Sequence, residues 1–498
     1  MVKGREKSDG RVVPQGRRKA VPTAAVERGG KVTTASEQAG QLQLSFGTAD
    51  SPRGADGGAE GGRPSSAPRA VPKPKRTRNR ILPAMTMEEV ADEANLRRAF
   101  QKVASNDGAP GPDRQSVAEV RERLNVVIPK LRRELLDGSY RPGMVRRVWI
   151  PKASGGERGL GIPDVVDRLV QQATHQVLSP HYEPTFHRSS HGFRPGKSCH
   201  TAIAEARQHL EEGHAWVVDI DLEKFFDRVN HDILMSRLAR RIGDKRLLRI
   251  IRRFLQAGLM QDGVCIAREE GTPQGGPLSP LLSNLLLDDL DQLLDSREHC
   301  FCRYADDCNI YVQSLAAGQR VMESVTRFLE GKLKLRVNRD KSAVAPVGER
   351  KFLGHRLISN GKLGISPKSI KRAKDRVREI TRRNRGVKFA QVIRELNLFL
   401  RGWFNYYRFA HCKVDLHLLD GWIRRKLRCY RLKQCKGAKS IARFLQKLGV
   451  SSAPAHQLAS SGKGWWRLSF TKAAHQAMST NWFASQGLLS LSRQYMTR

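Results

Sequence analysis

The amino-acid sequence predicts an α+β protein that begins with a disordered tail and ends in an α-helical region. Strand-like and helical stretches alternate from about 146 to 357, and the pattern from 368 to 436 is helical. Residues 1–80, in contrast, are rich in Gly, Pro, Ser, Ala and basic residues. These three observations predict the fold class, because apolar spacing distinguishes helices from strands and its absence indicates disorder.

The charge of the chain predicts a polyanionic partner. The 498 residues include 89 Lys and Arg but only 49 Asp and Glu, which gives a formal net charge of +40. Such a balance favours nucleic acid or a membrane surface over the small substrates of an ordinary metabolic enzyme. No run of about 18 apolar residues is present, so we expect no spanning helix. The first thirty residues are charged and Gly-rich and lack an apolar core, so we expect no secretory signal. The eight Cys lack zinc-site or disulfide spacing, which favours a reducing compartment.

The N-terminal part of the chain predicts a tail followed by one helix. We assign 1–80 to the disordered tail, because its composition cannot bury enough apolar surface to offset the entropy lost on ordering. We assign 81–130 to an N-terminal extension. The segment MEEVADEANLRRAFQKVA, which starts at Met87, has acids in its first turn and bases in its last, as the helix dipole favours. The Gly and Pro of SNDGAPGPD then end this helix.

Three later segments predict strands. YRPGMVRRVWIPK reads as a strand that ends in a basic loop, and HAWVVDIDL is apolar and of strand length. HCFCRYADDCNIYVQS reads as two strands around a tight turn. A shift in composition near residue 360 predicts a domain boundary. Beyond it, residues 368–436 carry 21 Lys and Arg against 5 Asp and Glu, a net charge of +16.

Two acidic clusters are the strongest chemical signal. Asp219 and Asp221 would share one face of a strand, and Asp306 and Asp307 would lie at the tip of a hairpin. Taken singly, a turn Asp-Asp or a strand-end Asp is ordinary, since Asp side chains bond to nearby backbone or to water. Two such clusters in a basic chain indicate a functional site, because carboxylates on apolar strands repel each other and lose solvation. Divalent cations would relieve that cost, as they do in phosphoryl-transfer enzymes.

Nine blocks, in a fixed order, identify a family that the chain resembles. They are NDGAPGPD, IPKASGGERGLGIP, SSHGFRPGKSCHTAI, DIDLEKFFDRVNHD, GTPQGGPLSPLLSNLLLDDLD, RYADD, LRVNRDKS, KFLGHRL and LNLFLRGWFNYYR. A single block arises easily by chance, whereas nine in order are highly specific. On these blocks the chain resembles the group II intron-encoded proteins, which combine a reverse transcriptase with a maturase.

The resemblance implies an architecture and an activity. It implies a right-hand polymerase, with fingers and an antiparallel palm sheet in 131–358 and an α-helical thumb and maturase domain in 366–440. Residues 441–498 would form a C-terminal extension without the zinc endonuclease of many relatives. The implied activity is RNA-directed DNA synthesis with two Mg²⁺ ions, dNTPs, an RNA template and a DNA primer. The further implied partners are the group II intron RNA and a DNA target, with no membrane and a bacterial cytoplasmic setting.

The resemblance also assigns roles to single residues. Asp221, Asp306 and Asp307 would be the catalytic metal ligands, with the backbone carbonyl of Leu222 beside them and Asp219 in a supporting place. The nucleotide-binding residues implied in the same way are Lys152, Arg158, Phe226, Gln274 and Lys341. Apart from the resemblance, Phe226 could equally be a core aromatic. Lys152 and Arg158 would read as loop cations and Lys341 as a surface charge.

The basic region after 366 predicts an RNA-binding surface. RNA binding needs cations for phosphates and flat groups for stacking on unpaired bases. We assign this role to Arg401, Arg408, Arg424 and Arg425. The aromatics of the same block are expected to pack the helical core rather than to stack on RNA: Trp403, Phe404, Tyr406 and Tyr407.

Two rival interpretations remain. The first is a reverse transcriptase of another lineage, such as a retron or CRISPR-associated enzyme, which usually lacks the RGWFNYYR block. The second is an RNA-binding splicing factor whose polymerase site has decayed. The intact residues Asp221, Asp306, Asp307 and Gln274 argue against decay.

Overall fold

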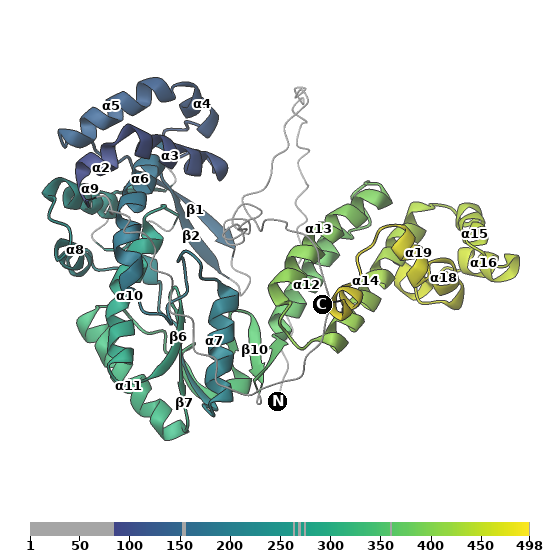
Figure 1. Cartoon of the computed structure of the whole chain (residues 1–498). Helices are drawn as coiled ribbons and strands as arrows, with labels where there is room; N and C mark the ends of the chain where they lie inside the picture. The colour runs from purple at the N-terminus through teal and green to yellow at the C-terminus, as the bar shows by residue number, and fades with distance from the viewer. Residues whose placement is uncertain are drawn as a thin grey trace, which may run out of the picture. The chain divides into compact units, whose positions relative to one another are not determined.

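The computed structural model describes residues 84–151, 156–261, 264–266, 270–272, 275–358 and 361–497. The tail expected over 1–80 lies outside the described residues. The described chain alternates helices and strands up to Ile365 and is helical afterwards, as the composition predicts (Figure 1). No described helix is both long and apolar enough to span a bilayer.

Four helices open the described chain. They are α2 (Met87–Ala91), α3 (Glu93–Ser105), α4 (Val117–Glu122) and α5 (Leu124–Leu136). The prediction of one continuous helix from Met87 is wrong, because Asp92 leaves the helical region at ψ 133° and starts α3. Its carboxylate accepts a hydrogen bond from the backbone N–H of Asn95 at 2.9 Å. An Asp that can cap a helix start favours a break where the charge pattern alone indicates continuity.

The first sheet has the strand order β2-β1-β4-β5. Its strands are β1 (Val145–Pro151), β2 (Glu157–Ile162), β4 (Leu259–Gln261) and β5 (Val264–Ile266). The strand predicted in YRPGMVRRVWIPK is therefore present as β1. β1 pairs with β2 in antiparallel fashion from Arg146 opposite Ile162 to Pro151 opposite Glu157, so the basic loop joins the two strands.

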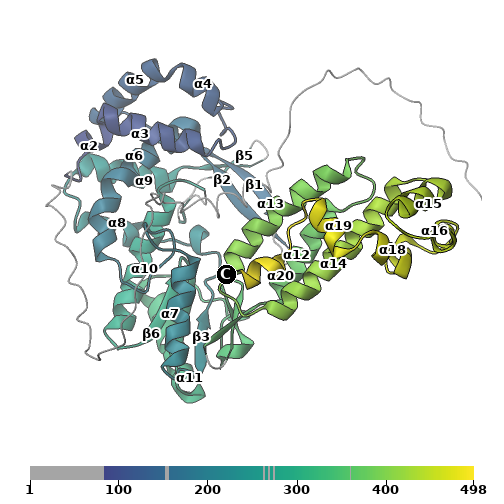
Figure 2. The same ribbon diagram turned by 45° about the vertical axis from the view of Figure 1, so that its right-hand side comes forward.

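A second sheet carries the two acidic clusters. It is antiparallel throughout, in the order β6-β7-β3-β8. Its strands are β3 (Trp216–Ile220), β6 (Cys300–Tyr304), β7 (Asp307–Val312) and β8 (Ala343–Pro346). Figure 2 shows helix α7 alongside β3 and β6. A third, small sheet contains β9 (Lys351–Phe352), β10 (His355–Ile358) and β11 (Lys362–Ile365).

The two faces of the β6-β7-β3-β8 sheet pack against different layers. Val218 and Ile310 belong to the large core that includes α10 (Ser279–Asp295) and α11 (Leu315–Lys332). Val217 and Tyr311 face the other way, into a smaller core with α7 (Cys199–Glu211) and the β9–β11 sheet. Because side chains alternate along a strand, Asp219 and Asp221 lie on this second face.

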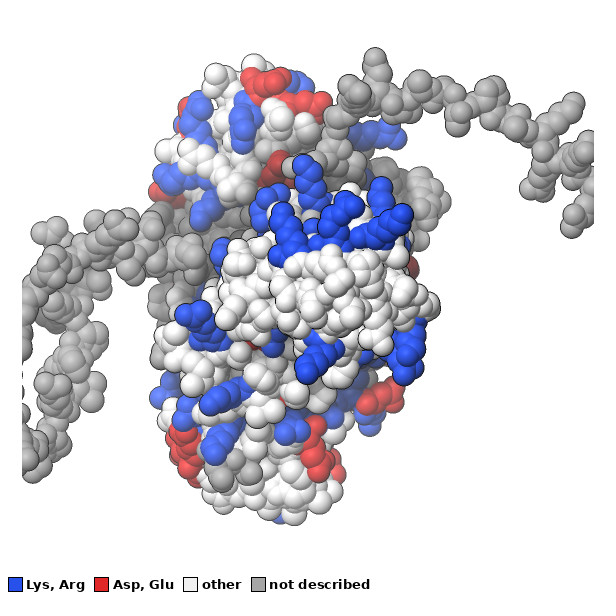
Figure 3. Space-filling model, turned by 90° about the vertical axis from the view of Figure 1, so that its right-hand side faces the viewer, with Lys and Arg blue, Asp and Glu red and all other residues white. Residues whose placement is uncertain are grey.

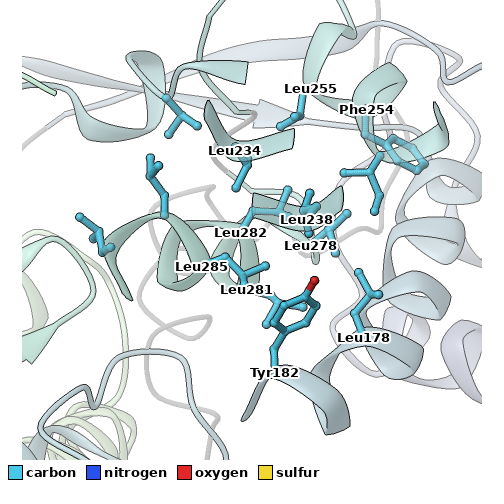
Figure 4. Close-up of a cluster of buried hydrophobic side chains, with 14 of the residues drawn as sticks. Leu178, Tyr182, Leu234, Leu238, Phe254, Leu255, Leu278, Leu281, Leu282 and Leu285 are labelled. Carbon is cyan, nitrogen blue, oxygen red and sulfur yellow. The ribbon is translucent and has the colours of Figure 1, made fainter. Parts of the chain in front are cut away.

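Helix α10 lies at the centre of the large core. Figure 4 shows its leucines among side chains from α6 (Val165–Tyr182), α8 (His231–Ala239) and α9 (Lys245–Gln256). The α10 residues Leu286 and Leu290 are at most 1% exposed. A helix that is apolar on nearly all sides is stable only when other elements surround it. One face of the β6-β7-β3-β8 sheet packs against this same core.

The chain after Ser366 forms a separate apolar core of helices. Its helices are α12 (Pro367–Ile380), α13 (Phe389–Tyr407), α14 (Lys413–Gln434), α15 (Ala438–Lys447), α16 (Ser452–Ala459), α17 (Trp465–Leu468), α18 (Lys472–Ala477), α19 (Thr480–Ser485) and α20 (Leu491–Met496). Pro367 occupies the first turn of α12, where its missing N–H costs no hydrogen bond, and Ser366 caps that helix.

Candidate active site

The register of β3 and β7 brings the two acidic clusters together. Asp219 pairs with Asn309 and Ile220 pairs with Cys308, so Asp221, which directly follows β3, lies at the same end of the sheet as Asp307, the first residue of β7. Directly opposed residues of antiparallel strands lie about 5 Å apart at their Cα atoms. Residues more than eighty positions apart in the sequence therefore meet at one end of the sheet.

The β6–β7 turn is held in an uncommon backbone conformation. Tyr304 pairs with Asp307, which leaves Ala305 and Asp306 as a two-residue turn. Ala305 has a φ of 58°, in the left-handed region that non-glycine residues seldom adopt. Gly192 packs directly against this turn, and a Cβ there would overlap the backbone nitrogen of Ala305. The surrounding structure thus fixes the turn that presents Asp306.

A buried arginine anchors the same turn. Arg303 is fully buried and donates a hydrogen bond to the carbonyl of Ala305 at 2.9 Å. It also pairs with Asp291 of α10, at 2.7 Å through Nε and 2.5 Å through Nη2. Further bonds go to Asn284 at 3.0 Å and Ser190 at 2.7 Å. Sequence reasoning missed this network, although a lone Arg between apolar strand residues was a signal for it.

The carboxyl groups perturb one another strongly. Burial raises the pKa of Asp306; the nearby Arg158 opposes this shift and Asp221 adds to it. The pKa of Asp307 is raised to about 7, first by desolvation within the surrounding protein and then by the negative charges of Asp306, Asp219 and Asp221. Part of the residue is nevertheless exposed to solvent. Raised pKa values with these causes are typical of carboxylates that cluster at functional sites.

Lys341 and Arg350 contact the two acids of the β3 segment. Lys341 Nζ lies 3.3 Å from Oδ1 of Asp221, and the side chain of Asp221 is 31% exposed. Arg350 donates to Oδ2 of Asp219 at 2.9 and 2.7 Å. Asp219 is therefore already paired within the protein. The supporting role expected for Asp219 stays a prediction.

The residues fit a hard divalent cation. Carboxylate oxygens are the ligands that Mg²⁺ prefers. Burial, together with neighbouring acids, raises the pKa of Asp306 and of Asp307, and a bound cation would oppose that shift. Asp221, Asp306 and Asp307 do not form one of the tight groups whose ligand atoms all lie within 4.8 Å of one another. Among the described residues those groups are His191–Glu205–Cys302 and His209–Glu212–Cys300.

The expected nucleotide-binding residues fall into two sets. Lys152 and Gln274 lie outside the described residues. Arg158 is exposed at the start of β2 and close enough to Asp306 to act on its pKa. Phe226 is partly buried in the short helix η2 (Phe225–Asp227), with its ring edge-on to Phe225 at 5.2 Å.

The chain just past Asp221 is tied to a second segment. Leu222 forms an isolated antiparallel bridge with Val337. The carbonyl of Asp221 accepts from the N–H of Asn338 at 2.8 Å, and its N–H donates to Ser342 Oγ at 3.0 Å. The same loop carries Lys341, which explains why that lysine reaches Asp221.

The RGWFNYYR aromatics are part of the helical core, as expected. Phe404 and Tyr407 are 8% exposed, and Trp403 and Tyr406 pack against the same cluster. The expected RNA-binding residues differ in exposure. Arg401 on α13 and Arg408 at the end of that helix are exposed, whereas Arg424 and Arg425 on α14 are half-buried.

Comparison with known proteins gives two family matches. The reverse transcriptase (RNA-dependent DNA polymerase) family matches residues 150–357, and the group II intron maturase-specific domain matches 370–449. The chain is 38% identical to protein YkfC of Escherichia coli K12 over 304 residues, which cover 53% of this chain and 80% of YkfC. It is 37% identical over 200 residues to the group II intron-encoded protein LtrA of Lactococcus lactis, covering 39% of this chain but only 33% of LtrA.

A solved structure is also similar in part. It is a chain of a partial Cas6-RT-Cas1–Cas2 complex, with a TM-score of 0.33 and 24% identity, covering 49% of this chain and 42% of that one. Nothing about the fold or partners of this chain rests on that likeness.

Proposed function

The chain belongs to the group II intron-encoded proteins, with a reverse transcriptase and a maturase domain, and from this premise we propose how it acts. Its RNA-directed DNA polymerase would hold two Mg²⁺ ions on Asp221, Asp306 and Asp307, with the carbonyl of Leu222 beside them. The observation that supports this proposal is the β3–β7 register, whose last pair, Ile220 and Cys308, leaves Asp221 and Asp307 at the same end of the sheet.

We assign the polymerase parts to the sheets. The β6-β7-β3-β8 sheet would be the palm and the β2-β1-β4-β5 sheet the fingers, within 131–358. Residues 366–440 would be the thumb and maturase domain, and 441–498 a C-terminal extension. The nearness of Arg158 on β2 to Asp306 supports this assignment, because a cation beside the acids could contact a bound triphosphate.

The proposed reaction joins the primer 3′-oxygen to the α-phosphorus of a dNTP and releases pyrophosphate. Mg²⁺ bound at the aspartates supplies positive charge to the attacking and leaving oxygens. Arg158 and Lys341, together with Lys152 and Gln274, would orient the triphosphate and the base. Phe226 would lie under the sugar and exclude a 2′-hydroxyl by its bulk. Lys341, whose Nζ lies 3.3 Å from Oδ1 of Asp221, would also offset the negative charge of that carboxylate.

The maturase role is binding without chemistry. The basic helices after 366, with Arg401, Arg408, Arg424 and Arg425, would bind the intron RNA and stabilise its splicing-active fold. DNA synthesis on an intron RNA template at a DNA target would then support mobility. The bacterial cytoplasm is the expected setting.

Primer extension on an RNA template tests the polymerase proposal. Wild type should extend a DNA primer with Mg²⁺ and dNTPs, and Asp306→Asn, which keeps the side-chain shape, should reduce extension at least a thousandfold. Asp219→Asn is the matched control, because Asp219 is already paired with Arg350 and should retain much more activity. Equal loss in both variants would contradict the assignment of the ligands.

A splicing assay separates the decayed splicing factor from the enzyme. Intron RNA affinity should be nearly the same for wild type and Asp306→Asn, since the maturase surface lies elsewhere. A wild type that promotes splicing but never extends a primer would show that the polymerase site has decayed.

A further inference from the structure

Aromatic rings and cations interleave on a surface formed by α14 and the chain around α17. We call this surface the stacking platform and define it as Trp422, Arg425, Lys426, Trp466 and Phe470. Trp466 and Phe470 lie beyond residues 370–449, the part that matches the maturase-specific family. The aromatics of RGWFNYYR, in contrast, lie in the helical core, as expected, and do not belong to this surface.

The platform has the geometry of a row of rings separated by cations. The guanidinium carbon of Arg425 lies 3.9 Å from the ring centre of Trp466 and 4.6 Å from that of Phe470. Lys426 Nζ lies 5.5 Å from the Trp466 ring and 5.7 Å from the Trp422 ring. Each distance is within the range of a cation–π contact, so the rings are held in fixed orientations.

Two of these rings, Trp466 and Phe470, are exposed to solvent, although two of the residues between them in the sequence are buried. Phe470 is 64% exposed and Trp466 is 42% exposed. Between them in the sequence, Leu468 is 5% exposed and Ser469 is fully buried. Single exposed apolar residues are ordinary, but two bulky aromatics beside one guanidinium form a small apolar patch that suggests a ligand.

The charge around the platform is uncompensated. Across the described ranges no carboxylate pairs with Arg424, Arg425 or Lys426. Arg425 donates one bond, to the Trp466 carbonyl at 3.0 Å, and its buried Nε has no partner. Burial, with Arg378 and Arg383, lowers the pKa of Lys426. Figure 3 shows Lys and Arg side chains gathered above and below an uncharged band at the end of the molecule that carries α15, α16 and α18.

We propose that the stacking platform binds unpaired bases of RNA, with Trp466 and Phe470 as stacking surfaces and Arg425 and Lys426 as phosphate-binding cations. The inference rests on the proposed function only in taking RNA as the partner. Every base has a flat face, so stacking is tolerant of sequence, while a duplex hides those faces inside the helix. The C-terminal extension would thereby enlarge the maturase surface toward single-stranded segments.

Photo-cross-linking locates the contact on the full-length protein. A single-stranded 20-nucleotide RNA that carries 5-iodouridine should cross-link to the peptide that contains Trp466 and Phe470, because this base reacts with aromatic rings stacked on it. The same RNA in a perfect duplex should give little of this product. Absence of the cross-link from the single strand would overturn the proposal.

Affinity measurements then separate stacking from charge. The double variant Trp466→Ala/Phe470→Ala should bind the single strand more weakly by about fivefold or more for each base that no longer stacks. Its salt dependence should be unchanged. Arg425→Gln/Lys426→Gln should reduce the slope of log affinity against log salt by about 1.4, or about 0.7 for each phosphate that is no longer neutralised. Leu418→Ala is the matched control, because Leu418 is a 64% exposed apolar residue on the same helix.

Each remaining outcome overturns the proposal. A double aromatic variant that binds the single strand as wild type does would show that the rings do not stack on bases. An equal loss for single strand and duplex would show a shape or charge effect. A change of oligomeric state with unchanged RNA affinity would assign the platform to a second copy of the chain. Primer extension by wild type is measured separately, so failure of the platform and failure of the polymerase are distinguishable.

Discussion

Breaking the Arg303–Asp291 pair should destabilise the protein more than any surface change. Both side chains have 0% exposure, and Arg303 makes five hydrogen bonds, two of them to Asp291. Asp291→Leu leaves the guanidinium buried without its charge partner, which costs about 3–5 kcal/mol. A change of that size should lower the melting temperature of the sheet-bearing part by roughly 10 °C.

A double-mutant cycle makes this prediction specific. Arg303→Met alone should also destabilise, whereas Arg303→Met/Asp291→Leu should recover part of the loss, because an apolar pair of similar volume needs no solvation. Thermal unfolding followed by circular dichroism measures all four proteins. A single Asp291→Leu shift below about 3 °C, or strict additivity of the two changes, would refute the reasoning.

The same cycle tests how the turn is positioned. The double variant lacks the donor to the Ala305 carbonyl, so Asp306 should lose its fixed place even where stability returns. We therefore expect weak primer extension and a higher Mg²⁺ requirement from a folded protein. A double variant as active as wild type would show that Arg303 serves stability alone.

Three further predictions follow from single side chains. Burial raises the pKa of Asp167 to about 7, so its contribution to stability is complete below the ordinary carboxyl range and is lost as pH rises toward 7. The free energy of unfolding of wild type should therefore fall by on the order of 1.4 kcal/mol per pH unit in this range. Urea unfolding at several pH values should show no such fall for Asp167→Asn, and the same pH dependence in both proteins would contradict this. Protonation of Asp307 below pH 7 should raise the Mg²⁺ concentration needed for half-maximal extension; equal requirements at pH 6 and 8 would exclude this. Phe226→Ala should improve ribonucleotide use at least about tenfold relative to dNTPs in competition assays, and unchanged sugar selectivity would remove Phe226 from the site.

Local patterns in the sequence predicted several elements correctly. The apolar run of strand length in HAWVVDIDL and the two runs around YADD indicated strands β3, β6 and β7, because strand-forming residues and turn residues are recognisable within a few positions. The helix from Met87 was misjudged, since dipole-favourable charges do not show that Asp92 prefers to cap a new start. The core role of Phe404 and Tyr407 was predicted correctly.

The tertiary structure alone decided which distant residues meet. The sequence determined that carboxylates stand at strand ends in a basic chain, and its ordered blocks determined the family. It did not encode in any local pattern that Asp221 and Asp307 lie at the same end of one sheet, that Arg303 reaches the Ala305 carbonyl, or that Trp466 and Phe470 flank Arg425. Strand register, burial and helix packing are set by the combined free energy of interactions between segments far apart in the chain, so they emerge only when the whole core forms.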